Sequence, residues 1–127
     1  MEGLTKEEAI KRHRQLWNYI ADESERQGRI ITKAEAFIYF GWPRYVRSFC
    51  WCCEYDKKFI DESYSNQCLN CPIKWPNERC KSDESPFSHY INAKNDNDYR
   101  FYCHKENVEK AVKAARDIAN LPENPNV

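Results

Sequence analysis

Two pairs of cysteines constrain this chain more than any other feature of its sequence. Cys50 and Cys53 form one C-x2-C pair, and after fourteen intervening residues Cys68 and Cys71 form a second pair. Two residues between thiols allow a tight turn that directs both sulfurs at one tetrahedral ion, and two such turns fill four coordination positions. The predicted site is a structural Zn²⁺ centre with four thiolate ligands: Cys50, Cys53, Cys68 and Cys71.

The chain holds seven cysteines, so a four-thiolate site leaves three of them over. Cys80 follows the second pair closely and is the reserve ligand, able to replace either cysteine of the first pair. Cys52 and Cys53 are neighbours whose side chains point apart, so they bind one ion less well than a C-x2-C pair does. Cys103 and His104 are adjacent too, and on a helix their side chains cannot both reach one ion. Cys52 and Cys103 are expected to be buried thiols that pack as small apolar groups.

The spacing leaves open whether Cys80, Cys52 or a histidine takes one of the four positions. It also leaves open whether any of the three histidines, His13, His89 and His104, has a role of its own.

No catalytic signature accompanies the cysteine pairs. A closed shell of four thiolates leaves no position for a water ligand, which is typical of structural zinc rather than catalytic zinc. The H-x-E element of zinc deaminases and the H-E-x-x-H and G-x-S-x-G elements of hydrolases do not occur in the sequence. The sequence therefore favours a protein that is not an enzyme.

The charge balance narrows the choice of partner and of compartment. Lys and Arg number 20, as do Asp and Glu, so the formal net charge is zero. A protein that binds duplex nucleic acid usually carries a basic excess, because phosphate contacts supply much of its affinity.

The N-terminus has no apolar leader, and no apolar run is long enough to cross a membrane. Seven cysteines in such a chain favour thiols in a reducing cytoplasm over disulfides.

The chain before the cysteines predicts two helices. A capping box at residues 5–8 opens a helix that should end at Gly28, and a second box at residues 32–35 opens a shorter helix that should end at Gly41. His13 lies on the apolar stripe of the first helix and is expected to be buried beside aromatic rings. A short strand is expected at residues 44–49, just before the first cysteine pair.

These patterns predict one α+β domain, mostly helical, arranged around a small zinc-ribbon or zinc-knuckle core. Its expected segments are a helical hairpin at 1–49, a zinc-binding module at 50–94, a C-terminal helix at 95–121 and a frayed tail at 122–127.

The cysteine pairs stand among further motifs. These are Glu7-Glu8-Ala9-Ile10, Leu16-Trp17 and Ile20-Ala21, then Glu54-Tyr55 after the first pair, Pro72-Ile73-x-Trp75 after the second, Cys80, Glu84-Ser85-Pro86-Phe87 and Ile118-Ala119-x-Leu121-Pro122. Together they resemble a group of small cysteine-motif proteins encoded by phages and prophages of Gram-positive bacteria, although Cys52, Cys103 and His104 depart from the pattern. The resemblance implies a zinc-binding accessory protein in the cytoplasm of a bacterial host. By analogy, we expect it to bind, and by binding to inhibit, a host or phage protein.

The alternative hypothesis is a zinc module that binds nucleic acid in a regulatory or processing role. Tyr45 and Trp42 could stack on bases between cationic side chains. The zero net charge speaks against this alternative. The cations that would contact phosphates are Lys11, Arg12, Arg14, Arg26, Arg29, Lys33, Arg44 and Arg47.

Overall fold

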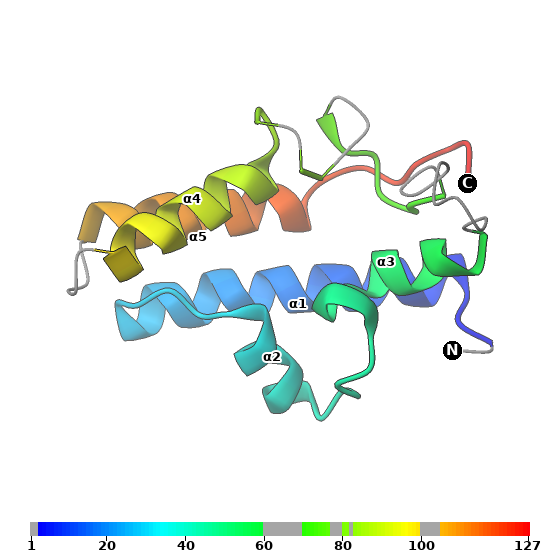
Figure 1. The fold of residues 1–127 in the computed structure, drawn as a ribbon, viewed down its shortest axis with the longest axis horizontal. Coiled ribbons are helices and arrows are strands. Elements are labelled where there is room, and N and C mark those ends of the chain that lie inside the picture. The colour runs from blue at the N-terminus through cyan, green and yellow to red at the C-terminus, as the bar shows by residue number, and fades with distance from the viewer. Residues whose placement is uncertain (1–2, 60–69, 77–79, 82, 100–104) are drawn as a thin grey trace.

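The computed structural model of the protein describes residues 3–59, 70–76, 80–81, 83–99 and 105–127 (Figure 1). Helices dominate this part of the chain, as the sequence predicts. Their order is α1 (Lys6–Gln27), α2 (Lys33–Phe40), the 3₁₀ helix η1 (Arg47–Phe49), α3 (Trp51–Asp56), the 3₁₀ helix η2 (Lys57–Phe59), α4 (Pro86–Tyr99) and α5 (Lys105–Ala119).

The threonine of each predicted capping box caps its helix, and both predicted helix ends are confirmed. The hydroxyl of Thr5 accepts a hydrogen bond from the Glu8 amide at 3.1 Å, which satisfies one of the free N–H groups at the start of α1. Thr32 does the same for α2. Gly28 and Gly41 end the two helices in the left-handed conformation, each with φ of 68°, which glycine adopts at little cost.

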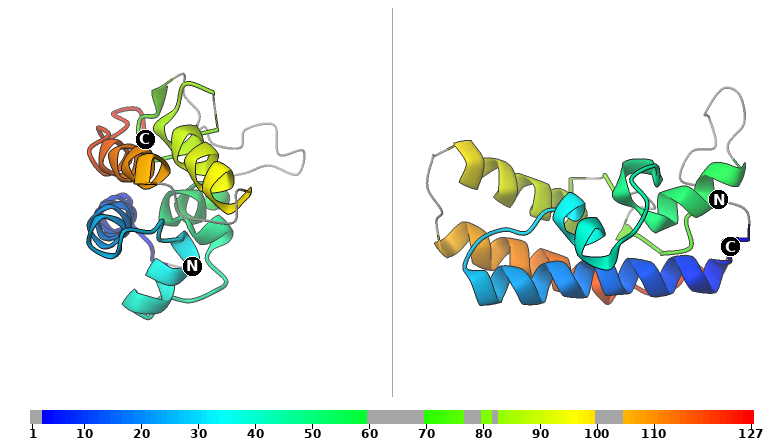
Figure 2. Two further views of the ribbon diagram at one scale, coloured as in Figure 1. Left: turned by 90° about the vertical axis from the view of Figure 1, so that its left-hand side faces the viewer. Right: turned by 90° about the horizontal axis from the view of Figure 1, so that it is seen from below.

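The core lies between α1, α4 and α5. Helix α5 packs along α1 and also along α4, so α5 contacts both of the other long helices (Figures 1 and 2). The buried stripe of α1 includes Leu16, Trp17 and Ile20, as its three- and four-residue spacing predicts. Tyr90 of α4 packs edge-on against Trp17, and its hydroxyl donates a hydrogen bond to the carbonyl of Ile31 beyond α1.

A second group of rings joins α2 to the start of α3. Phe37 is 1% exposed and has the rings of Trp42, Phe49 and Trp51 within 6 Å of its own centroid. Phe37, Trp42 and Phe49 belong to the stretch between α1 and α3. Trp51 is the first residue of α3, which packs on α1. Aromatic side chains bury a large apolar area each, so these ring contacts hold the short helix α2 against the start of α3.

The expected β component is not found in the described residues. Where a strand was expected, at 44–49, the backbone turns into η1, with positive φ at Ser48 and Phe49. Two residues outside the turn stabilise it. The Lys33 ammonium donates a hydrogen bond to the Ser48 carbonyl, and the Glu54 carboxylate accepts one from the Arg47 amide. The sequence carries no local sign of either bond. The only bridge between extended residues in the described chain joins Ile73 and Glu123, and no zinc ribbon is seen there.

The C-terminal third also differs from the prediction. The residues 95–99, expected to open the last helix, instead close α4, and α5 begins at Lys105. The tail expected to fray is bonded to the rest of the protein. Asn124 donates its amide to the Pro72 carbonyl at 2.8 Å, and Lys6 donates to the carbonyls of Asn124 and Val127. These partners are distant in sequence, so the local pattern cannot reveal them.

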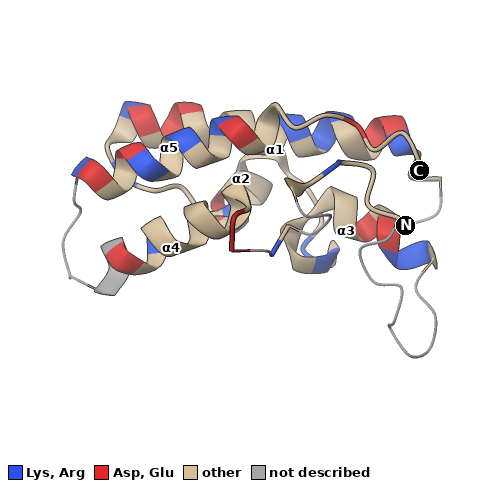
Figure 3. Ribbon diagram, turned by 90° about the horizontal axis from the view of Figure 1, so that it is seen from above, with Lys and Arg blue, Asp and Glu red and all other residues tan. Residues whose placement is uncertain are grey.

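Charged side chains of both signs alternate along α1 and α5, whereas α2 and most of α4 carry few (Figure 3). Arg116 of α5 reaches across to Asp22 and Glu25 of α1. Among the described helices, none is both long enough and apolar enough to cross a bilayer.

Candidate metal centre

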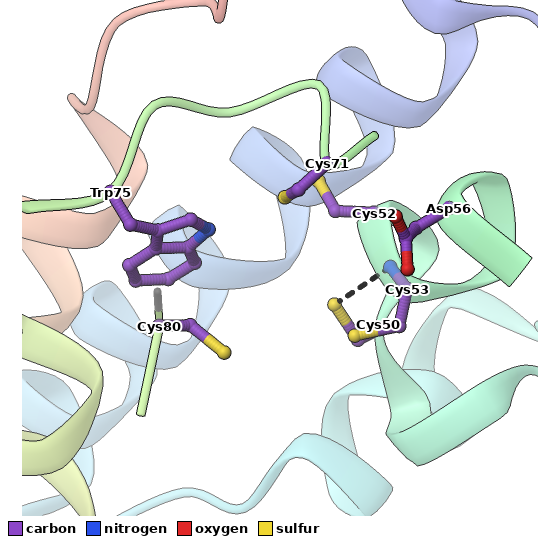
Figure 4. Close-up of a pocket in the computed structure, with 7 residues that line it drawn as sticks. All are labelled: Cys50, Cys52, Cys53, Asp56, Cys71, Trp75 and Cys80. Atoms are coloured by element: carbon purple, nitrogen blue, oxygen red, sulfur yellow. Dashed lines mark hydrogen bonds between the residues drawn. The ribbon is translucent and has the colours of Figure 1, made fainter. Parts of the chain in front are cut away.

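Sulfur atoms from three segments line one small cavity beside α1 (Figure 4). The first segment is the start of α3, the second follows residue 69, and the third lies just before α4. The five cysteines among the described residues are thiols rather than disulfides. The lining consists of Cys50, Cys52, Cys53, Asp56, Cys71, Trp75 and Cys80.

The first cysteine pair is shaped by the start of α3. Cys50 is the residue that caps the helix, and its sulfur accepts a hydrogen bond from the amide of Cys53 at 3.3 Å. A side chain in this position takes the place of the usual Ser, Thr or Asp cap. The C-x2-C spacing therefore does bend the chain so that Cys50 and Cys53 face the same cavity.

Cys71 is held by contacts on both sides of its own turn. The amide of Ile73 and the indole of Trp75 both donate hydrogen bonds to the Cys71 sulfur. Its carbonyl accepts a bond from the Asn124 side chain at 3.2 Å. The second cysteine segment is thus fixed by the C-terminal tail as well as by its own sequence.

Hydrogen bonds among the sulfurs divide them into two kinds. Donation from the thiols of Cys52 and Cys53 lowers the pKa of Cys50, and donation from Cys52 lowers the pKa of Cys71. Burial raises the pKa of Cys52, and the hydrogen bond to Cys50 raises that of Cys53. Because the thiolate is the form that binds metal, Cys50 and Cys71 are the sulfurs best prepared to do so.

The lining fits a metal ion by its chemistry. Thiolates are the preferred ligands of structural Zn²⁺, and the cavity of about 20 Å³ has room for roughly one water-sized particle. In the chain as described, no three His, Cys, Asp or Glu side chains already stand in an arrangement that could hold a metal ion. Binding would therefore have to draw the sulfurs together, as in sites whose geometry forms only with the metal.

His13 is buried beside this cluster, as the sequence predicts. Its side chain is 1% exposed, and its ring packs edge-on against Trp75 with 5.9 Å between centroids. Burial lowers the pKa of His13, and the nearby sulfur of Cys50 acts in the opposite direction. His13 does not belong to the lining of the cavity.

Of the four predicted zinc ligands, three come together in the structure. Cys50, Cys53 and Cys71 line the cavity, whereas Cys68 lies outside the described residues, as do Cys103 and His104. The cavity also includes Cys80, the reserve ligand, and Cys52, which is buried as expected. His89 is on α4 and lines a different cavity of about 390 Å³ between α4 and α5.

Two further residues position the cysteines, and sequence reasoning missed both. The carboxylate of Asp56, in the last turn of α3, accepts the amide of Asn70 at 2.8 Å, which ties the second cysteine segment to α3. Asn124 binds the same segment from the other side. An Asp at the end of the first cysteine helix is a weak local signal, but nothing near Asn124 indicates its partner.

Comparison with protein-family models, with curated proteins and with solved structures finds no match to this chain.

Proposed function

We propose that this protein is a non-enzymatic binding protein whose fold is completed by one structural Zn²⁺ ion. The observation that carries the metal hypothesis is the convergence of five cysteine sulfurs on a cavity of single-ion size. Cys50, Cys53 and Cys71 supply three thiolates. The fourth is either Cys68, which is favoured by its spacing, or Cys80, which lines the cavity.

The chemistry of the lining favours a structural role for the ion. Four thiolates close a tetrahedral shell and leave no site for an activated water. Among the described residues that line the cavity, Asp56 carries the one carboxylate, and it already accepts a hydrogen bond from Asn70. It is therefore engaged in holding the second cysteine segment, and is not placed as a base for a metal-bound water.

The position of the ion suggests what it stabilises. The first cysteine pair belongs to α3, which packs on α1, and Cys71 belongs to the segment bonded to the C-terminal tail. An ion shared by these segments would join the two halves of the chain. Zinc in such a position contributes directly to the free energy of folding.

The binding function rests on exposed apolar and aromatic side chains in α2 and just after it. Ile38, Tyr39 and Tyr45 are 65–69% exposed, and they lie within eight residues of one another. Exposed Tyr and Arg side chains supply much of the affinity at protein interfaces, and Arg44 and Arg47 flank Tyr45. We propose a protein partner from the host or the phage, in keeping with the resemblance to phage accessory proteins.

Metal content is the direct test of the zinc hypothesis. We expect native mass spectrometry to find about one Zn²⁺ per chain in the wild-type protein, since one closed shell needs four thiolates. Cys50→Ser should lose the ion, whereas the matched variant Cys52→Ser should keep it, because Cys52 and Cys53 are neighbours whose side chains diverge. Loss of zinc from Cys52→Ser with retention in Cys50→Ser would reverse the choice of ligand.

Several of the Lys and Arg side chains that would contact phosphates already contact other groups of the protein, which weakens the nucleic-acid alternative. Arg12 lies over the buried Trp51 ring at 4.4 Å, and Arg14 donates to the Leu121 carbonyl. Arg26 and Arg29 pair with carboxylates close to them. These side chains already have partners within the protein, so they are less available to phosphates.

Arg44 and Arg47 are the appropriate pair for a direct test, because their side chains make no hydrogen bond or ion pair with the described residues. We expect weak or no binding of single- and double-stranded nucleic acid by the wild type and by Arg44→Gln/Arg47→Gln, measured at two salt concentrations. Lys110→Gln on α5 is the control. Tight wild-type binding whose salt slope falls by about two units in the double variant would favour the nucleic-acid function instead.

A further inference from the structure

Four aromatic rings form a continuous row that runs from α1 across α2. Tyr19 of α1 stacks on Tyr39 of α2 with 4.3 Å between the ring centroids, and Phe40 stacks on Trp42 at the same distance. An edge-on contact between Tyr39 and Phe40, at 5.0 Å, joins these two pairs. None of the four side chains is fully buried, and Tyr39 is 65% exposed. The ring row of Tyr19, Tyr39, Phe40 and Trp42 therefore presents aromatic surface to solvent.

Buried rings hold the ring row in place from below. Trp42 packs edge-on against Phe37 and Trp51, which are 1% and 0% exposed. Rings that are already fixed by stacking lose little side-chain freedom when a partner binds, so the entropic cost of binding is low. Ile38, next to Tyr39 in α2, adds an aliphatic side chain that is 69% exposed. The apolar part of this surface is thus preorganised for contact with another apolar surface.

The uncompensated charge near the ring row is positive. Arg44 and Arg47 lie within five residues of its last member, and their side chains make no hydrogen bond or ion pair with the described residues. Nearby carboxylates are already engaged, since Glu35 pairs with Arg29 at 2.9 Å and the buried Glu54 accepts from the Arg47 amide. Carboxylates are the groups that pair best with guanidinium. A complementary partner therefore carries carboxylates beside its apolar side chains.

We infer that the ring row and Ile38, together with Arg44 and Arg47, bind an acidic segment of the partner protein, in which Asp or Glu residues accompany apolar side chains. This inference rests on the proposed binding function and specifies the chemistry of the partner.

Two other occupants fit the surface less well. Stacking within the ring row already covers ring faces that nucleic-acid bases would need, and two guanidinium groups are few for binding that depends on phosphates. In a symmetric dimer, the same surface of a second copy would bring its own Arg44 and Arg47, so the complementary carboxylates would be missing.

Selection from a library of random peptides displayed on phage tests the inference with a defined probe. The purified wild-type protein is the bait. We expect the enriched peptides to combine Asp or Glu with aromatic or large aliphatic residues, because the surface offers both cations and rings. One enriched peptide is then synthesised, and its dissociation constant is measured by fluorescence anisotropy.

Two variants separate the charged contacts from the apolar ones. Arg44→Glu/Arg47→Glu should weaken binding of this peptide about tenfold or more, because repulsion replaces attraction at both positions. Tyr39→Ala should weaken it about thirtyfold, as expected for an aromatic anchor. Lys105→Glu/Lys110→Glu is the matched control and should bind like the wild type, since it makes the same charge change on α5, which packs on α1 and α4 rather than on α2.

A change in the peptide provides the same test without any variant of the protein. Replacing its Asp and Glu residues with Asn and Gln should also weaken binding to the wild type about tenfold. Enriched peptides without Asp or Glu, or binding that is weakened by Tyr39→Ala but not by Arg44→Glu/Arg47→Glu, would overturn the acidic partner and leave the binding surface standing. A selection that enriches no peptide, or binding that neither variant changes, would overturn both.

The other two occupants have readouts of their own. Single-stranded DNA that binds the wild type tightly and is released by Arg44→Glu/Arg47→Glu would overturn the inference in favour of nucleic acid. A dimer in sedimentation velocity that Tyr39→Ala dissociates would overturn it in favour of a second copy of this chain. We expect the wild type to sediment as a monomer and to bind the acidic peptide in preference to the DNA.

Discussion

Replacing Cys71 with serine is expected to unfold the protein or to remove its metal ion. Cys71 is a predicted ligand in either choice of the fourth thiolate, and its sulfur already accepts hydrogen bonds from Ile73 and Trp75. A structural zinc ion contributes folding free energy on the order of 10 kcal/mol. That is as large as the whole stability of a typical domain, about 5–15 kcal/mol, so the loss of one ligand should not be tolerated.

The measurement combines zinc content with thermal unfolding followed by circular dichroism. Chelation of zinc from the wild-type protein should reproduce the effect of Cys71→Ser without any change in sequence. Cys52→Ser is the matched control, because Cys52 lines the same cavity and is more deeply buried, yet is not a predicted ligand. Full zinc content and an unchanged melting temperature in Cys71→Ser would contradict the metal site.

Phe37→Ala should be a costly single change away from the cysteines. Phe37 is buried at the centre of a ring cluster formed by Trp42, Phe49 and Trp51, and it fixes α2 to the segment that leads into α3. Truncation of a buried Phe removes its transfer free energy and leaves a cavity, which together cost about 3–5 kcal/mol. We expect a loss of this size in the free energy of unfolding, measured with urea on the zinc-loaded protein.

Ile38→Ala is the control for this experiment. Ile38 is the next residue of the same helix, but its side chain is 69% exposed. Surface changes of this kind usually alter stability by no more than about 0.5 kcal/mol. Equal destabilisation by the two variants would mean that the ring cluster does not hold α2 in place.

Local signals in the sequence were enough to locate α1 and α2. A capping box is formed by residues three apart, and a glycine at a helix end acts through its own backbone, so Thr5, Gly28, Thr32 and Gly41 specify these boundaries without help from the rest of the fold. The C-x2-C spacing of Cys50 and Cys53 is local in the same sense, and the two residues do face one cavity.

The same local reasoning failed between residues 44 and 49 and near the C-terminus. The segment before Cys50 was expected to form a short strand, but a strand needs a neighbour to accept its backbone hydrogen bonds. Here the Arg47 amide finds the carboxylate of Glu54 instead, and the chain turns. The tail at 122–127 was expected to fray, because nothing in its sequence shows that Asn124 bonds to the Pro72 carbonyl.

The sequence by itself determined the prediction of thiolate ligation, since its seven cysteines include two C-x2-C pairs. Only the tertiary structure decided which sulfurs meet. Cys80 lines the same cavity as Cys50, Cys53 and Cys71, and Cys71 is fixed by Asn124, 53 positions further along the chain. Contacts at such separation depend on how α1, α4 and α5 pack, and packing is a property of the whole chain that no spacing within one segment can express.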